Sequence, residues 1–239
     1  MATACSRPLT TRVDVEADRV HPVKRHRPIA AGTLPVRVAV GGGVVLLLLG
    51  LGVALAANAA LFGVIATYVL LTASYTRWLK HEPVFDIAIV ATGFFLRAVA
   101  GGVASDLFIS RWFLIVAAGG SLFLIAGKRY AEKVAGGDEL GSRTTLRHYS
   151  AEYLRGILST AAGITVIAYC LWAFERGVNI EPSGWTGLST VPFVLGIMRY
   201  GLLLDQGHGE EPEEVLLGDR VLLILGAVWL ALLVLGVAT

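Results

Sequence analysis

The sequence is poor in charge and nearly free of cysteine. Only 16% of its 239 residues are charged, whereas soluble domains carry about 25%. Disorder is excluded because 55% of the residues are hydrophobic, and disordered chains lack apolar side chains. Cys5 and Cys170 are the only cysteines, which excludes a secreted scaffold built on disulfides. The net charge of +2 is too small to indicate a nucleic-acid partner.

Long apolar runs fill most of the chain, and the charges cluster in short segments between them. Such runs, of about 20 residues, are what helices need to cross a bilayer, whereas a barrel would show short alternating segments. The predicted fold class is therefore all-α, a polytopic transmembrane helical bundle. We expect seven helices, at Val36–Ala57, Ala60–Trp78, Val84–Ala104, Trp112–Gly127, Tyr153–Phe174, Trp185–Leu204 and Val221–Val237.

The basic residues lie on alternate loops, and this pattern predicts the orientation. Lys and Arg mark the cytoplasmic side of a membrane protein. We therefore predict a multi-pass protein of the cell membrane whose amino terminus lies inside and whose carboxyl terminus lies outside. Residues 1–35 would form a cytoplasmic segment, and residues 36–239 one membrane domain.

The segment "DVEADRVHPVKRHRPIAAG" combines acids with a basic cluster. Asp14 and Asp18 are four residues apart and would share one face of a helix, where they could hold Mg²⁺ together with water and phosphate oxygens. The alternative is a polar helix beside the membrane with Asp–Arg pairs. The basic residues Lys24, Arg25 and Arg27 suit phosphate oxygens, or they only set the topology.

Further polar side chains are expected at the same membrane face. They are Tyr75, Lys80 and Asp86 in "SYTRWLKHEPVFD", Arg97 in the next span, and Lys128, Arg129 and Tyr130 in "GKRYAE". Charges inside a membrane are costly and usually serve a site, so we expect Asp86 and Arg97 to be buried or nearly buried and functional. Three loops that bring acids, bases and tyrosines to one face predict a polar cavity there.

Two later loops add smaller expectations. Residues 131–150 are polar enough to form a mobile flap or a helix at the membrane interface. Asp219, directly before the last apolar run, is predicted to cap that helix, and the other acids around it are expected to be solvated. The five histidines lack the spacing of metal ligands, so no zinc site is expected.

These motifs resemble the UbiA superfamily of intramembrane transferases. The likeness is carried by "DVEADRVHPVKRHRPIAAG", "YTRWLKHEPVFD", "FLRAVAGGVAS" and "GSLFLIAGKRYAE", and it is strongest to the branch of decaprenyl-phosphate phosphoribosyltransferases. The resemblance implies a Mg²⁺-dependent glycosyltransferase that moves 5-phosphoribose from phosphoribosyl diphosphate to a polyprenyl phosphate, for cell-wall arabinan synthesis. The active site would face the cytoplasm.

The resemblance also implies roles for single residues. Asp14 and Asp18 would be catalytic and, together with Asp86, would lie on the metal side. Phosphates would be contacted by Lys24, Arg25, Arg27, Lys80, Lys128 and Arg129. Tyr75, Arg97 and Tyr130 would shape the donor pocket.

The sequence also departs from the family pattern. The family has Asn-Asp where this chain has Thr10 and Thr11, and two further helices are expected ahead of Asp14. Two alternatives therefore stay open: a UbiA-type prenyltransferase that acts on an aromatic or other acceptor, and an inactive truncated membrane protein. A homo-oligomer is also left open.

Overall fold

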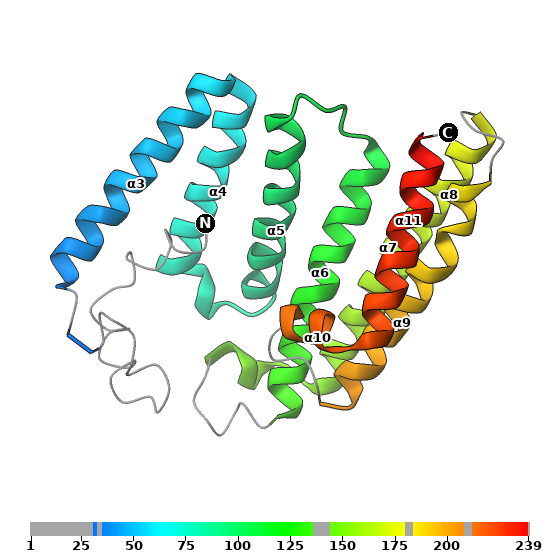
Figure 1. The fold of residues 1–239 in the computed structure, drawn as a ribbon. Helices are drawn as coiled ribbons and strands as arrows, with labels where there is room; N and C mark the ends of the chain where they lie inside the picture. The colour runs from blue at the N-terminus through cyan, green and yellow to red at the C-terminus, as the bar shows by residue number, and fades with distance from the viewer. Residues whose placement is uncertain (1–30, 33–34, 136–143, 180–183, 208–211, 239) are drawn as a thin grey trace.

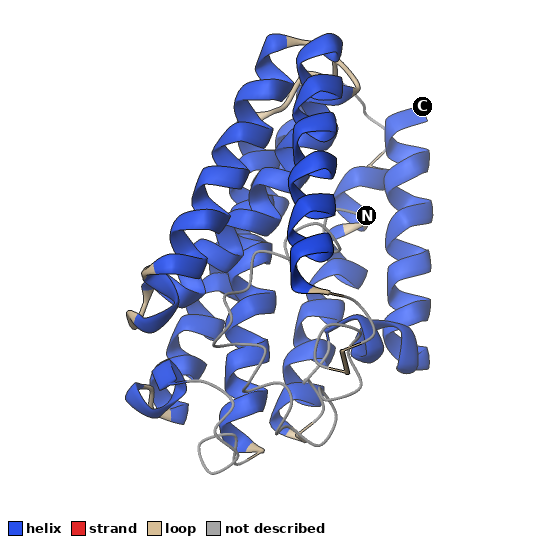
Figure 2. Ribbon diagram, turned by 90° about the vertical axis from the view of Figure 1, so that its left-hand side faces the viewer, coloured by secondary structure: helices blue, strands red, loops and turns tan. Residues whose placement is uncertain are grey.

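The computed structural model describes residues 31–32, 35–135, 144–179, 184–207 and 212–238. Within these ranges the protein is helical and contains no strand (Figure 2). The α-helices are α3 (Val36–Ala57), α4 (Ala59–Arg77), α5 (Phe85–Ala104), α6 (Arg111–Val134), α7 (Ala151–Asn179), α8 (Trp185–Leu188), α9 (Thr190–Asp205), α10 (Pro212–Gly218) and α11 (Arg220–Ala238). Two 3₁₀ helices are η3 (Leu79–His81) and η4 (Thr144–His148).

The helices α3 to α7 follow one another as neighbours in a curved row (Figure 1). The helices α8, α9 and α11 pack together beyond α7, and the contact between α6 and α7 is the most extensive one in the bundle. The helices α4, α6 and α9 end, and α5, α7 and α11 begin, at the end where η3 and η4 lie. We call this the η3–η4 end.

Six helical segments are long and apolar enough to cross a membrane, and the protein is accordingly a multi-pass membrane protein. These segments are α3, α4, α5, α6, Ala151–Glu175 within α7, and Trp185–Asp205 across α8 and α9. The seventh expected span corresponds to the shorter apolar helix Arg220–Gly236. Leu48 and Val53 of α3 are 61% and 70% exposed, as suits side chains that face lipid rather than water.

The expected single span from Trp185 to Leu204 is interrupted at Ser189, between α8 and α9. Pro192 lies four residues after Leu188, and a proline both lacks the N–H that would bond that carbonyl and clashes with it. The Ser189 hydroxyl donates a hydrogen bond to the Thr186 carbonyl at 2.6 Å. The Thr190 hydroxyl likewise donates to the Gly187 carbonyl at 2.7 Å, so side chains supply hydrogen bonds at the break.

The helices α6 and α7 approach closely because α6 has a glycine at the contact. A Cβ atom on Gly119 would lie 2.5 Å from the Thr165 hydroxyl and 3.4 Å from the Thr165 backbone nitrogen. That hydroxyl is held by its own bond to the Ala161 carbonyl at 2.7 Å. Small residues at such contacts let membrane helices pack backbone against backbone.

We expect Gly119→Ala to destabilise the protein by about 1–3 kcal/mol, because the added methyl overpacks this contact. Gly120→Ala is the matched control, since a Cβ there would meet its nearest neighbour at 4.0 Å. Thermal unfolding in detergent should show a lower melting temperature for Gly119→Ala only. Equal melting temperatures for the two variants would contradict this account of the α6–α7 contact.

Candidate functional site

The structure brings the described residues of the predicted site, except Arg97, to the η3–η4 end. Tyr75 lies in the last turn of α4 and Lys80 in η3, while Asp86 lies in the first turn of α5. Lys128, Arg129 and Tyr130 lie near the end of α6. The predicted residues Asp14, Asp18, Lys24, Arg25 and Arg27 lie outside the described residues, so their roles stay predictions.

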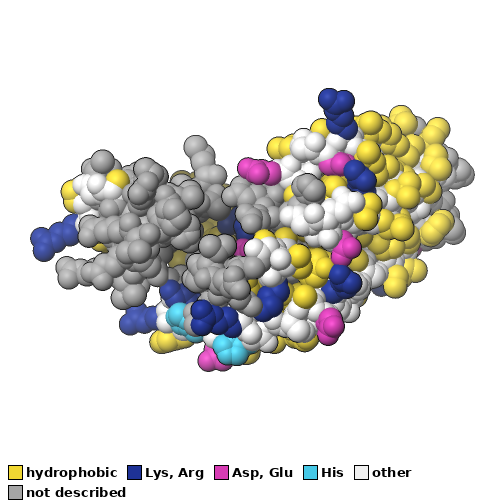
Figure 3. Space-filling view, turned by 90° about the horizontal axis from the view of Figure 1, so that it is seen from below, with side chains coloured by type: hydrophobic (Ala, Val, Ile, Leu, Met, Phe, Trp, Pro, Cys, Tyr) yellow, Lys and Arg dark blue, Asp and Glu magenta, His cyan; other side chains and the backbone are white. Residues whose placement is uncertain are grey.

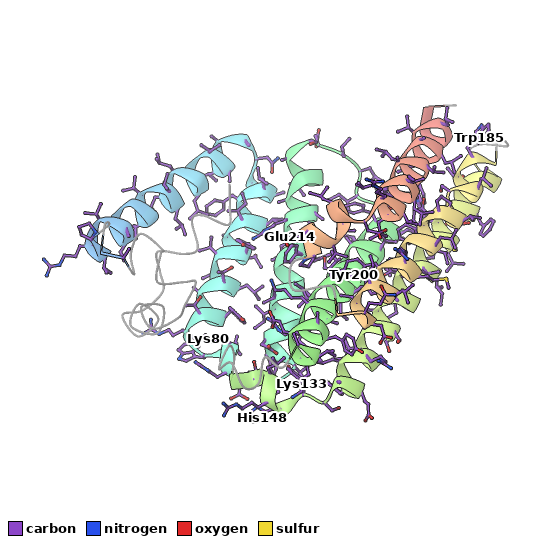
Figure 4. All side chains as sticks on the ribbon, turned by 60° about the horizontal axis from the view of Figure 1, so that its bottom comes forward. Lys80, Lys133, His148, Trp185, Tyr200 and Glu214 are labelled. Carbon is purple, nitrogen blue, oxygen red and sulfur yellow. The ribbon has the colours of Figure 1, made fainter. Side chains whose placement is uncertain are left out.

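Basic side chains gather at this end. The 3₁₀ helix η3 carries Lys80 and His81, and η4 carries Arg147 and His148. Seen from below, the histidines lie among Lys and Arg side chains at one edge of this end (Figure 3). Lys80 and His148 are both at this end, whereas Trp185 is at the opposite one (Figure 4).

Asp86 is fully buried, with 0% of its surface exposed, which confirms that it is a buried charge. One carboxylate oxygen accepts a hydrogen bond from the Tyr149 hydroxyl at 2.5 Å. The other accepts one from the Thr145 hydroxyl at 3.2 Å and lies 3.4 Å from Nε of Arg129. Both oxygens therefore contact protein donors, and the expected metal role of Asp86 stays a prediction.

Arg129 lies between two carboxylates and is only 2% exposed. Besides Asp86, it pairs with Glu132, whose Oε2 lies 3.0 Å from Nη1. The sequence predicted a phosphate contact for Arg129, but in this structure its guanidinium is buried against acids. Its neighbour Lys128 is half-buried, and within the described ranges no carboxylate forms an ion pair with it.

Tyr149 is the residue that closes this cluster, and the sequence did not indicate it. Its hydroxyl accepts a hydrogen bond from the backbone N–H of Val84 at 2.5 Å while donating to Asp86. Burial, and then the hydrogen bond to Asp86, raise the pKa of Tyr149, so the hydroxyl stays a neutral donor. Val84 has a φ of 70°, a strained conformation for a β-branched residue, and this strained residue directs its N–H at the hydroxyl.

Of the segment 131–150, which was expected to form a mobile flap or a helix at the membrane interface, the structure describes residues 131–135 and 144–150. Residues 144–148 form η4, and Thr145, Leu146 and Tyr149 are buried. The segment packs inward because the buried carboxylate of Asp86 needs donors. Thr145 and Tyr149 supply them, and only the requirement of a buried acid for partners could have pointed to these two residues.

Tyr130 belongs to a different cluster, formed by α6, α7 and α9. Its hydroxyl donates to Asp205 at 3.1 Å and accepts from Arg155 at 2.6 Å, and Arg155 pairs with Asp205 at 2.7 Å. No motif in the sequence indicates Arg155, whereas Asp205 begins the acidic loop before the last helix, most of whose acids are expected to be solvated. The proposed role of Tyr130 in the donor pocket stays a prediction, and its two hydrogen-bond partners lie on α7 and α9.

Arg97 is exposed rather than buried or nearly buried, so the expected burial is wrong. Its guanidinium donates a hydrogen bond to the Tyr68 hydroxyl at 2.7 Å. It also lies 5.4 Å from the centroid of the Tyr68 ring and 5.2 Å from that of Phe94. These aromatic contacts hold the cation at the surface of the bundle. Arg97 comes eleven positions after Asp86 and therefore lies roughly 16 Å further along the helix.

Comparison with known proteins shows to which family the chain belongs. Residues 11–217 match the UbiA prenyltransferase family. The chain belongs to this family. The motifs at Asp14–Gly32, Tyr75–Asp86 and Gly127–Glu132 lie inside the matched region, so the resemblance noted in the sequence is confirmed.

Three relatives in this family are named decaprenyl-phosphate phosphoribosyltransferase. The protein from Corynebacterium glutamicum is 46% identical over 229 residues, which cover 94% of this chain and 69% of the relative. The protein from Mycolicibacterium smegmatis is 43% identical, with 91% and 71% covered. The one from Mycobacterium tuberculosis strain H37Rv is 42% identical, with 91% and 72% covered.

A solved structure of a UbiA homolog from Archaeoglobus fulgidus has the same fold. It superposes with a TM-score of 0.68 at 17% identity and covers 98% of this chain and 81% of that chain. The UbiA-type helical bundle expected from the sequence is thus confirmed.

The UbiA family implies a divalent metal, and the described residues do not provide a set of ligands for one. Within the described ranges, no group of three or more His, Cys, Asp or Glu side chains could hold a metal ion. Asp86, the described acid that the sequence analysis placed on the metal side, is occupied by Tyr149, Thr145 and Arg129.

The predicted cap of the last helix is confirmed, and it has a second partner. Asp219 accepts the Leu222 N–H at 2.8 Å and pairs with Arg199 of α9, whose Nη2 lies 2.7 Å away. The hydrogen bond from Arg199, followed by that from Leu222, lowers the pKa of Asp219. A lowered pKa means that the stabilisation is present above the ordinary aspartate pKa and is lost as the pH falls through the lowered value.

We expect Asp219→Asn to keep the helix cap, since Asn caps as well as Asp, and to lose the ion pair with Arg199. The wild-type protein should therefore melt at a higher temperature than Asp219→Asn near neutral pH. This difference should shrink as the pH falls below the aspartate pKa of about 4. A difference in melting temperature that stays constant with pH would contradict the role of the pair.

Proposed function

We propose that this protein transfers 5-phosphoribose from phosphoribosyl diphosphate to a polyprenyl phosphate and releases diphosphate. The observation that carries the proposal is the 42–46% identity to decaprenyl-phosphate phosphoribosyltransferases over 91–94% of the chain. The multi-pass bundle suits a lipid acceptor, and the basic η3–η4 end suits a water-soluble anionic donor.

In the proposed reaction, a phosphate oxygen of the lipid attacks C1 of the ribose. The bond between C1 and the diphosphate oxygen breaks, and the electron pair leaves with the diphosphate. The lipid phosphate is already ionised near pH 7, so the nucleophile needs no strong general base. The task left for the protein is to stabilise the charge of the departing diphosphate.

Cationic side chains at the η3–η4 end are suited to this task. Lys128 is half-buried at the end of α6, and Lys80 lies in η3 on the same end of the bundle. We propose that both contact the phosphates of the donor, with Tyr75 beside them. Lys24, Arg25 and Arg27 complete the set in our proposal, on the basis of sequence alone.

The membrane supplies the reason for the position of the site. The polyprenyl tail stays in the bilayer while its phosphate reaches the η3–η4 end, where the donor arrives from water. We propose that this end and the amino terminus face the cytoplasm, because Lys and Arg are concentrated on the loops of that side. The product would then serve the synthesis of cell-wall arabinan.

For the metal, we propose Asp14 and Asp18 as ligands of Mg²⁺, since two carboxylates with water and phosphate oxygens are its usual environment. The ion would neutralise charge on the diphosphate. The proposal rests on the spacing of these two acids, and chelation of Mg²⁺ is expected to stop the reaction.

The activity can be tested with the purified protein in vesicles that contain decaprenyl phosphate. With phosphoribosyl diphosphate labelled in the ribose, we expect label in the lipid fraction and release of diphosphate. Prenyl diphosphates with an aromatic acceptor serve as the comparison. Turnover of the prenyl donors alone would reject the proposal in favour of a prenyltransferase, and turnover of neither would support an inactive membrane protein.

Lys128→Ala should raise KM for phosphoribosyl diphosphate roughly tenfold or more. A tenfold loss of affinity is about what the loss of one hydrogen bond to a charged group costs in binding free energy. The melting temperature should change little, because Lys128 has no ion-pair partner among the described residues. Arg111→Ala is the matched control, a cation removed from the opposite end of the bundle where it pairs with Glu175. Equal KM values for the two variants would argue against a phosphate contact by Lys128.

A further inference from the structure

We propose that Asp86, Arg129, Thr145 and Tyr149 form a clasp that fixes the segment 144–149 at the η3–η4 end, with Arg129 as a positioning residue and Lys128 as the phosphate contact. We call these four residues the Asp86 clasp. The part that concerns Lys128 rests on the proposed function, since the phosphate is that of the proposed donor. The part that concerns the clasp rests on the geometry alone.

The clasp joins three segments that are far apart in the sequence. Asp86 lies in α5 and Arg129 in α6, and the bonds from Asp86 to Thr145 and Tyr149 span 59 and 63 residues. The segment is held on both sides of Leu146, which is itself 0% exposed and whose carbonyl accepts a bond from Lys133 at 3.3 Å. The segment is thereby fixed by side chains from two different helices.

Charge explains why Arg129 stays within the clasp. A buried carboxylate is strongly unfavourable without a paired cation, and Arg129 supplies that cation to Asp86 at 3.4 Å. Its other end is neutralised by Glu132 at 3.0 Å. A phosphate contact by Arg129 would have to compete with these two acids for a guanidinium that is only 2% exposed.

Lys128 is placed differently although it is the adjacent residue. Successive residues of an α-helix point about 100° apart, so Lys128 and Arg129 project from different sides of α6. Lys128 is only half-buried and has no carboxylate partner in the described part of the chain. The ammonium group of Lys128 is therefore available to bind an anion, whereas the guanidinium of Arg129 is already paired with Asp86 and Glu132.

The clasp would influence the reaction by fixing the positions of Lys80 and Lys128. Asp86 follows η3, which carries Lys80, and Arg129 follows Lys128 directly, while η3 also contacts η4. Fixing α5 to α6 through Asp86 and Arg129 thus sets the distance between the two lysines. Loss of the clasp is expected to raise KM for the donor more than it lowers kcat.

Tyr149→Phe removes one bond of the clasp and keeps the ring. Tyr153→Phe is the matched control, because that ring stacks on Tyr149 with a centroid separation of 5.8 Å and lies outside the clasp. Hydrogen exchange of the peptide 144–150, followed by mass spectrometry, should be faster in Tyr149→Phe and unchanged in Tyr153→Phe. Unchanged exchange in both variants would overturn the clasp.

Arg129→Met tests the positioning role, with Asp86→Asn as its partner variant. We expect Arg129→Met to lower the melting temperature and to speed exchange of the peptide 144–150. The double variant Asp86→Asn and Arg129→Met should recover part of the loss, because the unpaired buried charge is removed. An Arg129→Met protein with normal exchange and melting temperature, but with a KM for the donor raised roughly tenfold, would show a direct phosphate contact and overturn the assignment.

The clasp and the role of Lys128 in donor binding are tested by different measurements, so one can be rejected without the other. Hydrogen exchange and melting temperature need no turnover, so they decide the clasp even in a protein without activity. A wild-type protein that does not bind phosphoribosyl diphosphate would reject the proposed function and the role of Lys128 with it. Binding that is weakened by Lys128→Ala and unaffected by Arg111→Ala supports both.

Discussion

The carboxylate of Asp86 is the feature on which the arrangement of the η3–η4 end depends. It is completely withdrawn from solvent, and a charge in such a place must find a cation and hydrogen-bond donors inside the protein. Arg129, Thr145 and Tyr149 supply them, and in doing so they draw α6 and the segment after it onto the start of α5. Removal of one partner of a buried pair typically costs about 3–5 kcal/mol, which is a large fraction of the stability of a domain.

Three consecutive polar residues near the end of α6 project in three directions and have different neighbours. Lys128 is half-buried, Arg129 turns to Asp86, and Tyr130 turns to Asp205 and Arg155 on α9 and α7. The rotation of about 100° per residue makes this possible, so one turn of α6 contributes to two separate side-chain clusters while Lys128 projects in a third direction. The close contact of α6 with α7 at Gly119 holds that helix in place along the membrane.

Much of the fold could be predicted from hydrophobicity alone. The ends of the helices agree with the expected spans to within a few residues over α3, α4 and α5, because a bilayer demands a fixed length of apolar helix. The cap at Asp219 and the burial of Asp86 followed from local rules of the same kind. The break before α9 did not follow from hydropathy, since Pro192 affects a carbonyl four residues earlier and leaves the apolar character of the span unchanged.

The sequence by itself determined the family, the membrane spans and the end of the bundle at which the polar residues gather, since each of these depends on residue type and spacing along the chain. Only the tertiary structure decided which of these residues contact one another. It placed Arg129 between acids and Arg97 at the surface, and it brought Thr145 and Tyr149 to Asp86 across about sixty residues of chain. The physical reason is that a buried charge selects its partners by distance in space, and spacing along a helix does not encode which distant loop will pack against it.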